Sequence, residues 1–185
     1  METQPEPVSD TGVSSRAWYG ASIADFLKAQ PDTVIGRLAR NSDFALLPTQ
    51  KDAWLEQIRL LQTCLIGLAG SLFLEFNIPR MGRRIDAVLL IGPVVFVIEF
   101  KVGESVFERA ASDQVWDYAL DLKNFHEASH SVSIVPVLIA TGATVSSLLE
   151  LRADEDRVYR LLPDILRQFA RSDRPCSGNC NGRCR

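Results

Sequence analysis

The sequence predicts an α/β protein with a mixed sheet of four or five strands flanked by helices. Two β-rich runs, Ile85 to Ile91 and Val94 to Val102, are separated by Gly92-Pro93, a pattern typical of a β-hairpin. Both runs are too apolar to face water on both sides, which is typical of central strands in a covered sheet. The order of the expected elements is helix, three strands, helix, strand, and it favours the same class.

Composition agrees with a single globular domain. The chain has 185 residues, 46% hydrophobic and 23% charged, which is enough for a sizeable core. The net charge of −3 means that nucleic-acid binding would need a local basic patch. We expect no transmembrane helix, because no apolar run reaches about 18 residues. The acidic N-terminus has no apolar signal-peptide region, so we expect a cytoplasmic location.

The chain divides into three parts. Residues 1–16 are polar and rich in Pro, Ser and Thr, and we expect them to be disordered. Residues 17–171 form the predicted domain, and residues 172–185 form a flexible tail. The tail holds three cysteines at regular spacing, Cys176, Cys180 and Cys184. Three soft ligands leave zinc binding open, but they do not make a disulfide framework.

Helical periodicity and caps mark the expected helices. These span residues 23–30, 33–40, 50–68 and 106–126, with a last helix from Pro163 to about Arg171. Ser22, Asp32 and Thr49 stand directly before the first three helices and can cap them. The third helix carries an apolar stripe at spacings of three and four, made of Trp54, Ile58, Leu61, Leu65 and Leu68.

Besides the hairpin, the expected strands are residues 72–78, 132–140 and 158–162. Strict alternation in the first of them would place Leu74, Phe76 and Ile78 on one face. Phe73, Glu75 and Asn77 would then lie on the other face.

Three charges interrupt the apolar hairpin. If Ile91 pairs with Val94, Asp86 lies directly opposite Glu99, with Cβ atoms about 4.5–5.5 Å apart. Strand alternation places Lys101 on the face of Glu99. Two neighbouring carboxylates repel each other, so a cation is expected between them. Mg²⁺ fits, because it binds one or two carboxylates together with substrate phosphate, and Mn²⁺ is the alternative.

The run Ile85-Asp86 followed by Glu99-Phe100-Lys101 resembles the PD-(D/E)xK nuclease superfamily, although Ile85 replaces the usual proline. The resemblance implies a restriction-endonuclease-like αβββαβ core. It also implies metal-dependent phosphodiester hydrolysis, with Asp86 and Glu99 as metal ligands and Lys101 as a catalytic residue.

The helix after the hairpin adds a second match. Its stripe consists of Phe107, Ala111, Gln114, Tyr118, Leu122 and Phe125. Gln114 and Tyr118 lie one turn apart, and this Gln-x-x-x-Tyr resembles the exonuclease-like branch of the superfamily, where it supports the site. Both side chains could instead be satisfied core residues. Glu56, on the long helix, could approach the site as a further acid, and Glu75 could assist the metal.

Three longer segments resemble the nuclease-like N-terminal region of bacterial DNA/RNA helicase-type ATPases: residues 78–86, 99–104 and 113–126. The resemblance covers about residues 17–170 and implies nucleic acid, DNA first, and a helicase-type ATPase as partners. The chain has no Gly-x-x-x-x-Gly-Lys-Ser/Thr loop, so it has no motor of its own. Arg80, Arg83 and Arg84 could line a phosphate path or form a solvated turn.

Two alternatives to a nuclease remain. One is a non-catalytic module of the same fold that binds nucleic acid or a partner. The other is a zinc peptidase, because His126-Glu127-Ala128-Ser129-His130 matches the zinc-protease pattern H-E-x-x-H. The position of this pattern argues against the peptidase, since it falls at the end of its helix, shortly before a strand beginning near Val132.

Overall fold

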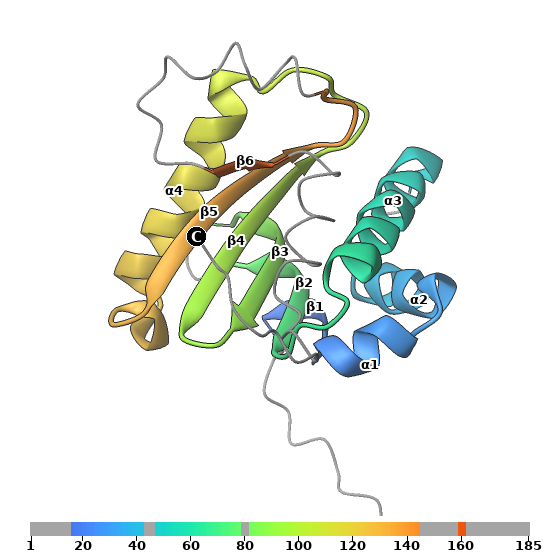
Figure 1. The fold of residues 1–185 in the computed structure, drawn as a ribbon, viewed down its shortest axis with the longest axis horizontal. Coiled ribbons are helices and arrows are strands. Elements are labelled where there is room, and N and C mark those ends of the chain that lie inside the picture. Colours follow the sequence, from blue (N-terminus) through green and yellow to red (C-terminus); the bar gives the residue numbers. More distant parts are fainter. Residues whose placement is uncertain (1–15, 43–46, 79–81, 145–158, 162–185) are drawn as a thin grey trace, which may run out of the picture.

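In the computed structural model, the protein forms a mixed sheet with helices on both faces (Figure 1). The structure describes residues 16–42, 47–78, 82–144 and 159–161. Strands β1 to β4 are antiparallel neighbours, whereas β4, β5 and β6 run parallel. The predicted α/β class is therefore confirmed.

The sheet has six strands in sequence order. They are β1 (Ala17–Ser22), β2 (Ser71–Asn77), β3 (Arg84–Ile91), β4 (Val94–Lys101), β5 (Ser133–Ala140) and β6 (Tyr159–Leu161). The hairpin and the other predicted strands are confirmed within a residue or two. Strand β1 was not predicted; it pairs with β2 from Ala17↔Phe76 to Ser22↔Ser71.

The helices are α1 (Ile23–Lys28), α2 (Pro31–Asn41), α3 (Pro48–Cys64), α4 (Arg109–Phe125) and the short 3-10 helix η1 (Glu127–Ser129). The Ser22 cap is confirmed, because its hydroxyl accepts the backbone N–H of Asp25 at 3.0 Å. The caps predicted at Asp32 and Thr49 are wrong. Helices α2 and α3 begin with proline, whose missing N–H would be unpaired in the first turn anyway.

Three predicted segments fall on residues that the structure does not describe: the disordered segment, apart from Arg16, the helix from Pro163 to about Arg171, and the tail of residues 172–185. The predicted long helix is shorter at its end, since α3 stops at Cys64 and a turn follows. Its stripe is confirmed at Trp54, Ile58, Leu61 and Leu65, which are all buried, whereas Leu68 lies beyond the helix and is only partly buried.

The core has two layers, one on each face of the sheet (Figure 1). Helices α1, α2 and α3 pack on one face through side chains such as Phe26, Leu38 and Ile58. Helix α4 covers the other face through Ala111, Val115 and Leu122. The helix begins at Arg109, three residues later than predicted, so Phe107 of the predicted stripe precedes it. The stripe is buried except at Gln114, which is partly buried, and at Phe125, which is 52% exposed.

The predicted alternation of β2 is wrong at Glu75. This residue has φ +52°, so the side chains of Leu74 and Glu75 both turn towards α3. After this point the faces are exchanged, and Phe76 and Ile78 pack in the α4 layer instead of beside Leu74. A positive φ at a residue other than glycine costs stability, so contacts elsewhere must hold Glu75 in place.

Gly70 lies just before β2 and packs closely against the backbone of β3, which can be tested by substitution. A Cβ added there would lie 2.0 Å from the carbonyl oxygen of Leu90. We expect Gly70→Ala to lower the free energy of unfolding by about 2 kcal/mol or more. Gly36→Ala in α2 is the matched control, because nothing lies within 4 Å of its added Cβ. Alanine's higher helix propensity should make that variant slightly more stable, by about 0.5–1 kcal/mol.

Urea denaturation of the two variants and the wild type measures both changes. A Gly70→Ala protein as stable as the wild type would contradict the close approach of Gly70 to β3.

Candidate functional site: the end of the sheet between β3 and β4

The candidate site lies where β3 and β4 separate. The predicted hairpin register is confirmed from Ile91↔Val94 to Ala87↔Ile98. The next residue in β3 is Asp86, and its Oδ2 accepts the backbone N–H of Phe100 at 2.8 Å. The Asp86 carboxylate thus bridges the two strands beside the backbone of Glu99.

A hydrogen-bonded chain links β4 to α4. Lys101 Nζ donates to Glu99 Oε1 at 2.9 Å and to Gln114 Oε1 at 3.1 Å. Gln114 Nε2 in turn donates to the hydroxyl of Tyr118 at 2.7 Å. The structure therefore brings Glu99, Lys101, Gln114 and Tyr118 together in one chain of hydrogen bonds. Gln114 contacts the lysine directly, and Tyr118 contacts Gln114.

Burial sets the electrostatics of the two carboxylates. Burial raises the pKa of Asp86 well above its usual value, and the neighbouring Glu99 carboxylate raises it further. Burial also raises the pKa of Glu99, and the hydrogen bond from Lys101 only partly offsets this. Glu99 is 5% exposed, and its buried Oε2 has no hydrogen-bond partner. Such a pair is stabilised by a cation or by protons.

The donor set fits a hard divalent cation. Asp86 and Glu99 offer carboxylate oxygens, and Oε2 of Glu99 is unused. Across the described residues, no group of three or more His, Cys, Asp or Glu side chains is arranged to hold a metal ion. A pair of protein carboxylates is typical of Mg²⁺, which retains several waters and takes further ligands from substrate phosphate.

A second charged cluster adjoins this pair, and the sequence did not predict it. Glu75 Oε1 accepts the indole N–H of Trp54 at 2.8 Å, and its Oε2 accepts Arg84 Nε at 2.9 Å. The Arg84 guanidinium lies 4.0 Å from the ring centre of Trp18. The sequence signal was the charge of Glu75 in an apolar strand. Its two partners come from α3 and β3, and Arg84 in turn contacts Trp18 of β1, so these contacts could not be identified from the sequence.

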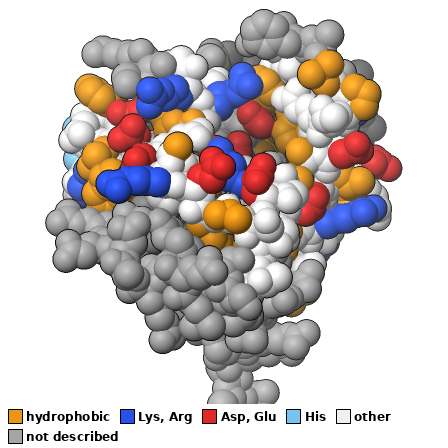
Figure 2. Space-filling model, turned by 90° about the horizontal axis from the view of Figure 1, so that it is seen from above, with side chains coloured by type: hydrophobic (Ala, Val, Ile, Leu, Met, Phe, Trp, Pro, Cys, Tyr) orange, Lys and Arg blue, Asp and Glu red, His pale blue; other side chains and the backbone are white. Residues whose placement is uncertain are grey.

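The three predicted arginines have different positions. Arg80 lies outside the described residues. Arg83 is exposed, and its guanidinium is 3.9 Å from the Asp117 carboxylate. Arg84 is half-buried in the second cluster. Figure 2, a view from above Figure 1, shows acidic side chains at the centre of this face with Lys and Arg side chains among and around them. The described surface on this side therefore carries mixed charge.

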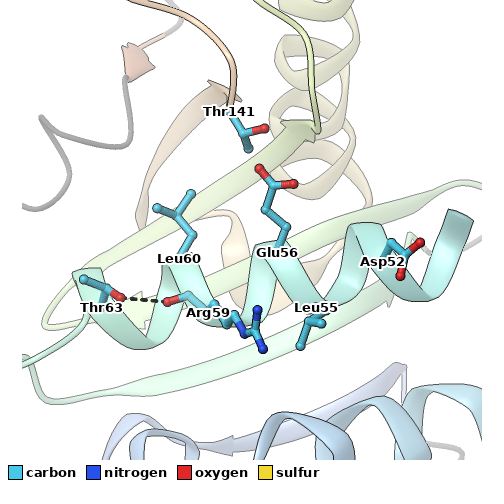
Figure 3. A pocket seen from close by; sticks show the side chains of 7 residues that line it. All are labelled: Asp52, Leu55, Glu56, Arg59, Leu60, Thr63 and Thr141. Carbon is cyan, nitrogen blue, oxygen red and sulfur yellow. Dashed lines mark hydrogen bonds between the residues drawn. The ribbon is translucent and has the colours of Figure 1, made fainter.

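A pocket of about 440 Å³ lies between α3 and the end of β5 (Figure 3). It is lined by Asp52, Leu55, Glu56, Arg59, Leu60, Thr63 and Thr141. Glu56 points towards Thr141 in this view. The Thr141 hydroxyl accepts the backbone N–H of Gly103 at 2.8 Å. The backbone N–H of Thr141 donates to the Lys101 carbonyl at 3.1 Å. Glu56 thus faces the backbone that follows Lys101, whereas the three predicted catalytic side chains do not line the pocket.

The zinc-protease pattern does not lie on one helix. Helix α4 ends at Phe125, and His126 is its C-terminal cap. The His126 ring is hydrogen-bonded to the Ser129 side chain, with 2.6 Å between His126 Nδ1 and Ser129 Oγ. A short 3-10 helix separates His126 from His130, so the rigid helical pair that a zinc peptidase needs is absent from this described segment.

The solved structures that are similar to this chain include two with low TM-scores. A repair endonuclease from Pyrococcus abyssi has a TM-score of 0.37 and 20% identity, over 66% of this chain and 50% of that chain. Protein VC1899 from Vibrio cholerae has a TM-score of 0.39 and 10% identity, over 83% of this chain and 44% of that chain. The chain thus spans about half the length of these structures or less. No protein-family model and no curated protein matches it.

A membrane-spanning helix must be both long and apolar. No helix in the described part of the chain meets both requirements.

Proposed function

We propose that this protein hydrolyses phosphodiester bonds in nucleic acid and depends on a divalent cation, Mg²⁺ or Mn²⁺. One observation carries the proposal. Two neighbouring carboxylates, the buried Glu99 and the partly buried Asp86, lie at the end of the sheet, where Lys101 hydrogen-bonds Glu99 and one Glu99 oxygen is left unpaired. Such an arrangement is costly for folding alone and suits a cation with a phosphate.

Each residue has a role in this proposal. Asp86 and Glu99 would hold the metal ion, which when bound supplies an activated water and stabilises developing negative charge. Lys101 orients or helps deprotonate the water and offsets charge on the phosphate. Gln114 fixes the Lys101 ammonium, and Tyr118 fixes the Gln114 amide. Glu56 would act from the pocket on α3 as a further acid, and Arg83 and Arg84 would contact backbone phosphates.

The biological setting is proposed from the sequence resemblance. DNA is the first candidate substrate, a helicase-type ATPase is the candidate partner, and the cytoplasm is the candidate location. Competition between unlabelled DNA and RNA for one labelled substrate would rank the two nucleic acids.

The test is incubation of the protein with labelled single- and double-stranded DNA and RNA, in Mg²⁺, Mn²⁺ or EDTA. We expect cleavage with metal, none with EDTA, and none with Glu99→Gln. His130→Ala is the control: it should cleave like the wild type, because His130 lies outside the carboxylate pair. Full activity of Glu99→Gln, or loss of activity together with bound zinc in His130→Ala, would contradict the proposal.

A non-catalytic nucleic-acid-binding module is the second candidate. The observation that favours it is that the carboxylate pair has no third metal-binding side chain among the described residues. Calorimetric titration with Mg²⁺ separates the two, because a binding module of this kind would bind nucleic acid without binding Mg²⁺ at Glu99.

A further inference from the structure

We infer that Arg84 binds a backbone phosphate flanking the scissile one, and that Glu75 and Trp18 are positioning residues that hold its guanidinium for this contact. The inference rests on the proposed function for the class of ligand, a nucleic-acid phosphodiester. It assigns to Glu75 a role other than metal binding.

The first support is how little of Arg84 is used by the protein. Its Nε donates to Glu75, and its face lies over the Trp18 ring. Within the described chain, the two terminal nitrogens of Arg84 have no recorded hydrogen-bond partner, and the side chain is 33% exposed. A guanidinium that is held at Nε and stacked on an aromatic ring keeps its two terminal nitrogens, here called the fork, in one orientation. This orientation suits a bidentate contact with phosphate.

The second support is the conformation of Glu75. Its φ of +52° and its burial at 7% exposure both cost stability, and an apolar residue in a regular strand conformation would avoid both costs. Both carboxylate oxygens are already bonded, one to Trp54 and one to Arg84. Glu75 therefore has no obvious free oxygen for a metal ion, and Arg84 is the one partner that reaches the surface.

The third support is location. Arg84 lies two residues before Asp86 in β3. The Glu75 carboxylate is close enough to Asp86 and Glu99 to raise the pKa of both. A phosphate on the Arg84 side chain would thus lie at the same end of the sheet as the carboxylate pair.

For nucleic-acid binding by Glu75→Gln, a positioning role of Glu75 and simple charge attraction predict changes in opposite directions. Glu75→Gln removes a negative charge and makes the protein more basic, so general attraction alone would strengthen nucleic-acid binding. If Glu75 positions Arg84, the same change loosens the fork and weakens binding.

The experiment measures binding of labelled single- and double-stranded oligonucleotides in EDTA, so that cleavage does not interfere, at several salt concentrations. We expect Arg84→Met to weaken binding about tenfold and to reduce the salt slope by about 0.7–0.9, the value for one phosphate contact. Arg84→Lys should recover little, because lysine has no fork. Glu75→Gln should weaken binding severalfold. Arg40→Met is the charge-matched control from α2, and it should change binding little.

Folding is checked separately, because Arg84→Met leaves the Glu75 carboxylate buried and unpaired. The double variant Glu75→Gln/Arg84→Met removes both charges, and it should bind as weakly as Arg84→Met while melting closer to the wild type. Binding by Glu75→Gln that equals or exceeds the wild type would overturn the inference. So would equal effects of Arg84→Met and Arg40→Met, or a wild type that binds none of the oligonucleotides.

The two proposals can fail independently. A wild type that binds in EDTA through Arg84 but does not cleave with Mg²⁺ or Mn²⁺ would refute the nuclease proposal and leave this inference intact. If Glu75→Gln and Arg84→Met both cleave with metal and bind as the wild type does, the Arg84 inference would be refuted and the nuclease proposal would stand.

Discussion

Replacing Lys101 with methionine is expected to reduce metal-dependent cleavage at least about a hundredfold, the usual contribution of one positioned proton-transfer group. The Lys101 ammonium contacts both Glu99 and Gln114, so its place at the end of β4 is fixed on two sides. Methionine keeps the length of the side chain but removes the charge and the donors. Single-turnover cleavage rates of wild type and variant, with excess enzyme and Mg²⁺, measure the effect.

Two further variants separate chemistry from stability. Lys101→Arg keeps the positive charge beside Glu99, so it should melt near the wild type yet remain slow, because arginine cannot give up its proton. Lys123→Met is the control, since Lys123 Nζ donates to the Val132 carbonyl beyond the end of α4. Cleavage by Lys101→Met at half the wild-type rate or more would exclude a catalytic role for this lysine.

The Asp86→Asn variant is expected to be at least as stable as the wild type in EDTA. Asparagine keeps an oxygen that can accept the Phe100 N–H, but it removes one of two neighbouring negative charges at a partly buried position. About 1 kcal/mol of relieved repulsion would raise the melting temperature by about 2–4 °C in a domain of this size. Mg²⁺ should reverse the order, because ion binding at 100 times its dissociation constant stabilises the wild type by about 2.7 kcal/mol.

The advantage of Asp86→Asn in EDTA should depend on pH. The raised pKa of Asp86 means that the folded state retains a proton which the unfolded state has already lost. The stability that this carboxyl contributes is therefore present at pH values below its unfolded pKa, near 4. It is lost as the pH rises through the higher folded pKa. The two proteins should thus be similar in acid and should diverge towards neutral pH.

Melting curves of both proteins from about pH 4 to pH 8, with EDTA or Mg²⁺, measure this difference. An Asp86→Asn protein that melts earlier in EDTA and still cleaves with Mg²⁺ would show that Asp86 is a structural residue.

The sequence by itself determined the hairpin and most of the site. Gly92-Pro93 and two apolar runs define the register from Ile91↔Val94, because a short turn leaves few ways to align its strands. The period of a strand places Glu99 and Lys101 on one face, and the period of a helix stacks Gln114 and Tyr118. These relations are local, so a reader of the sequence can derive them.

Tertiary structure alone decided the second cluster and the end of the hairpin. Strand β1 owes its place to backbone pairing with β2, which has no side-chain signature. The exchange of faces at Glu75 depends on Trp54 from α3 and Arg84 from β3, and Arg84 in turn stacks on Trp18 from β1. A strained φ is stable only when such distant partners hold it, because the local sequence favours regular alternation.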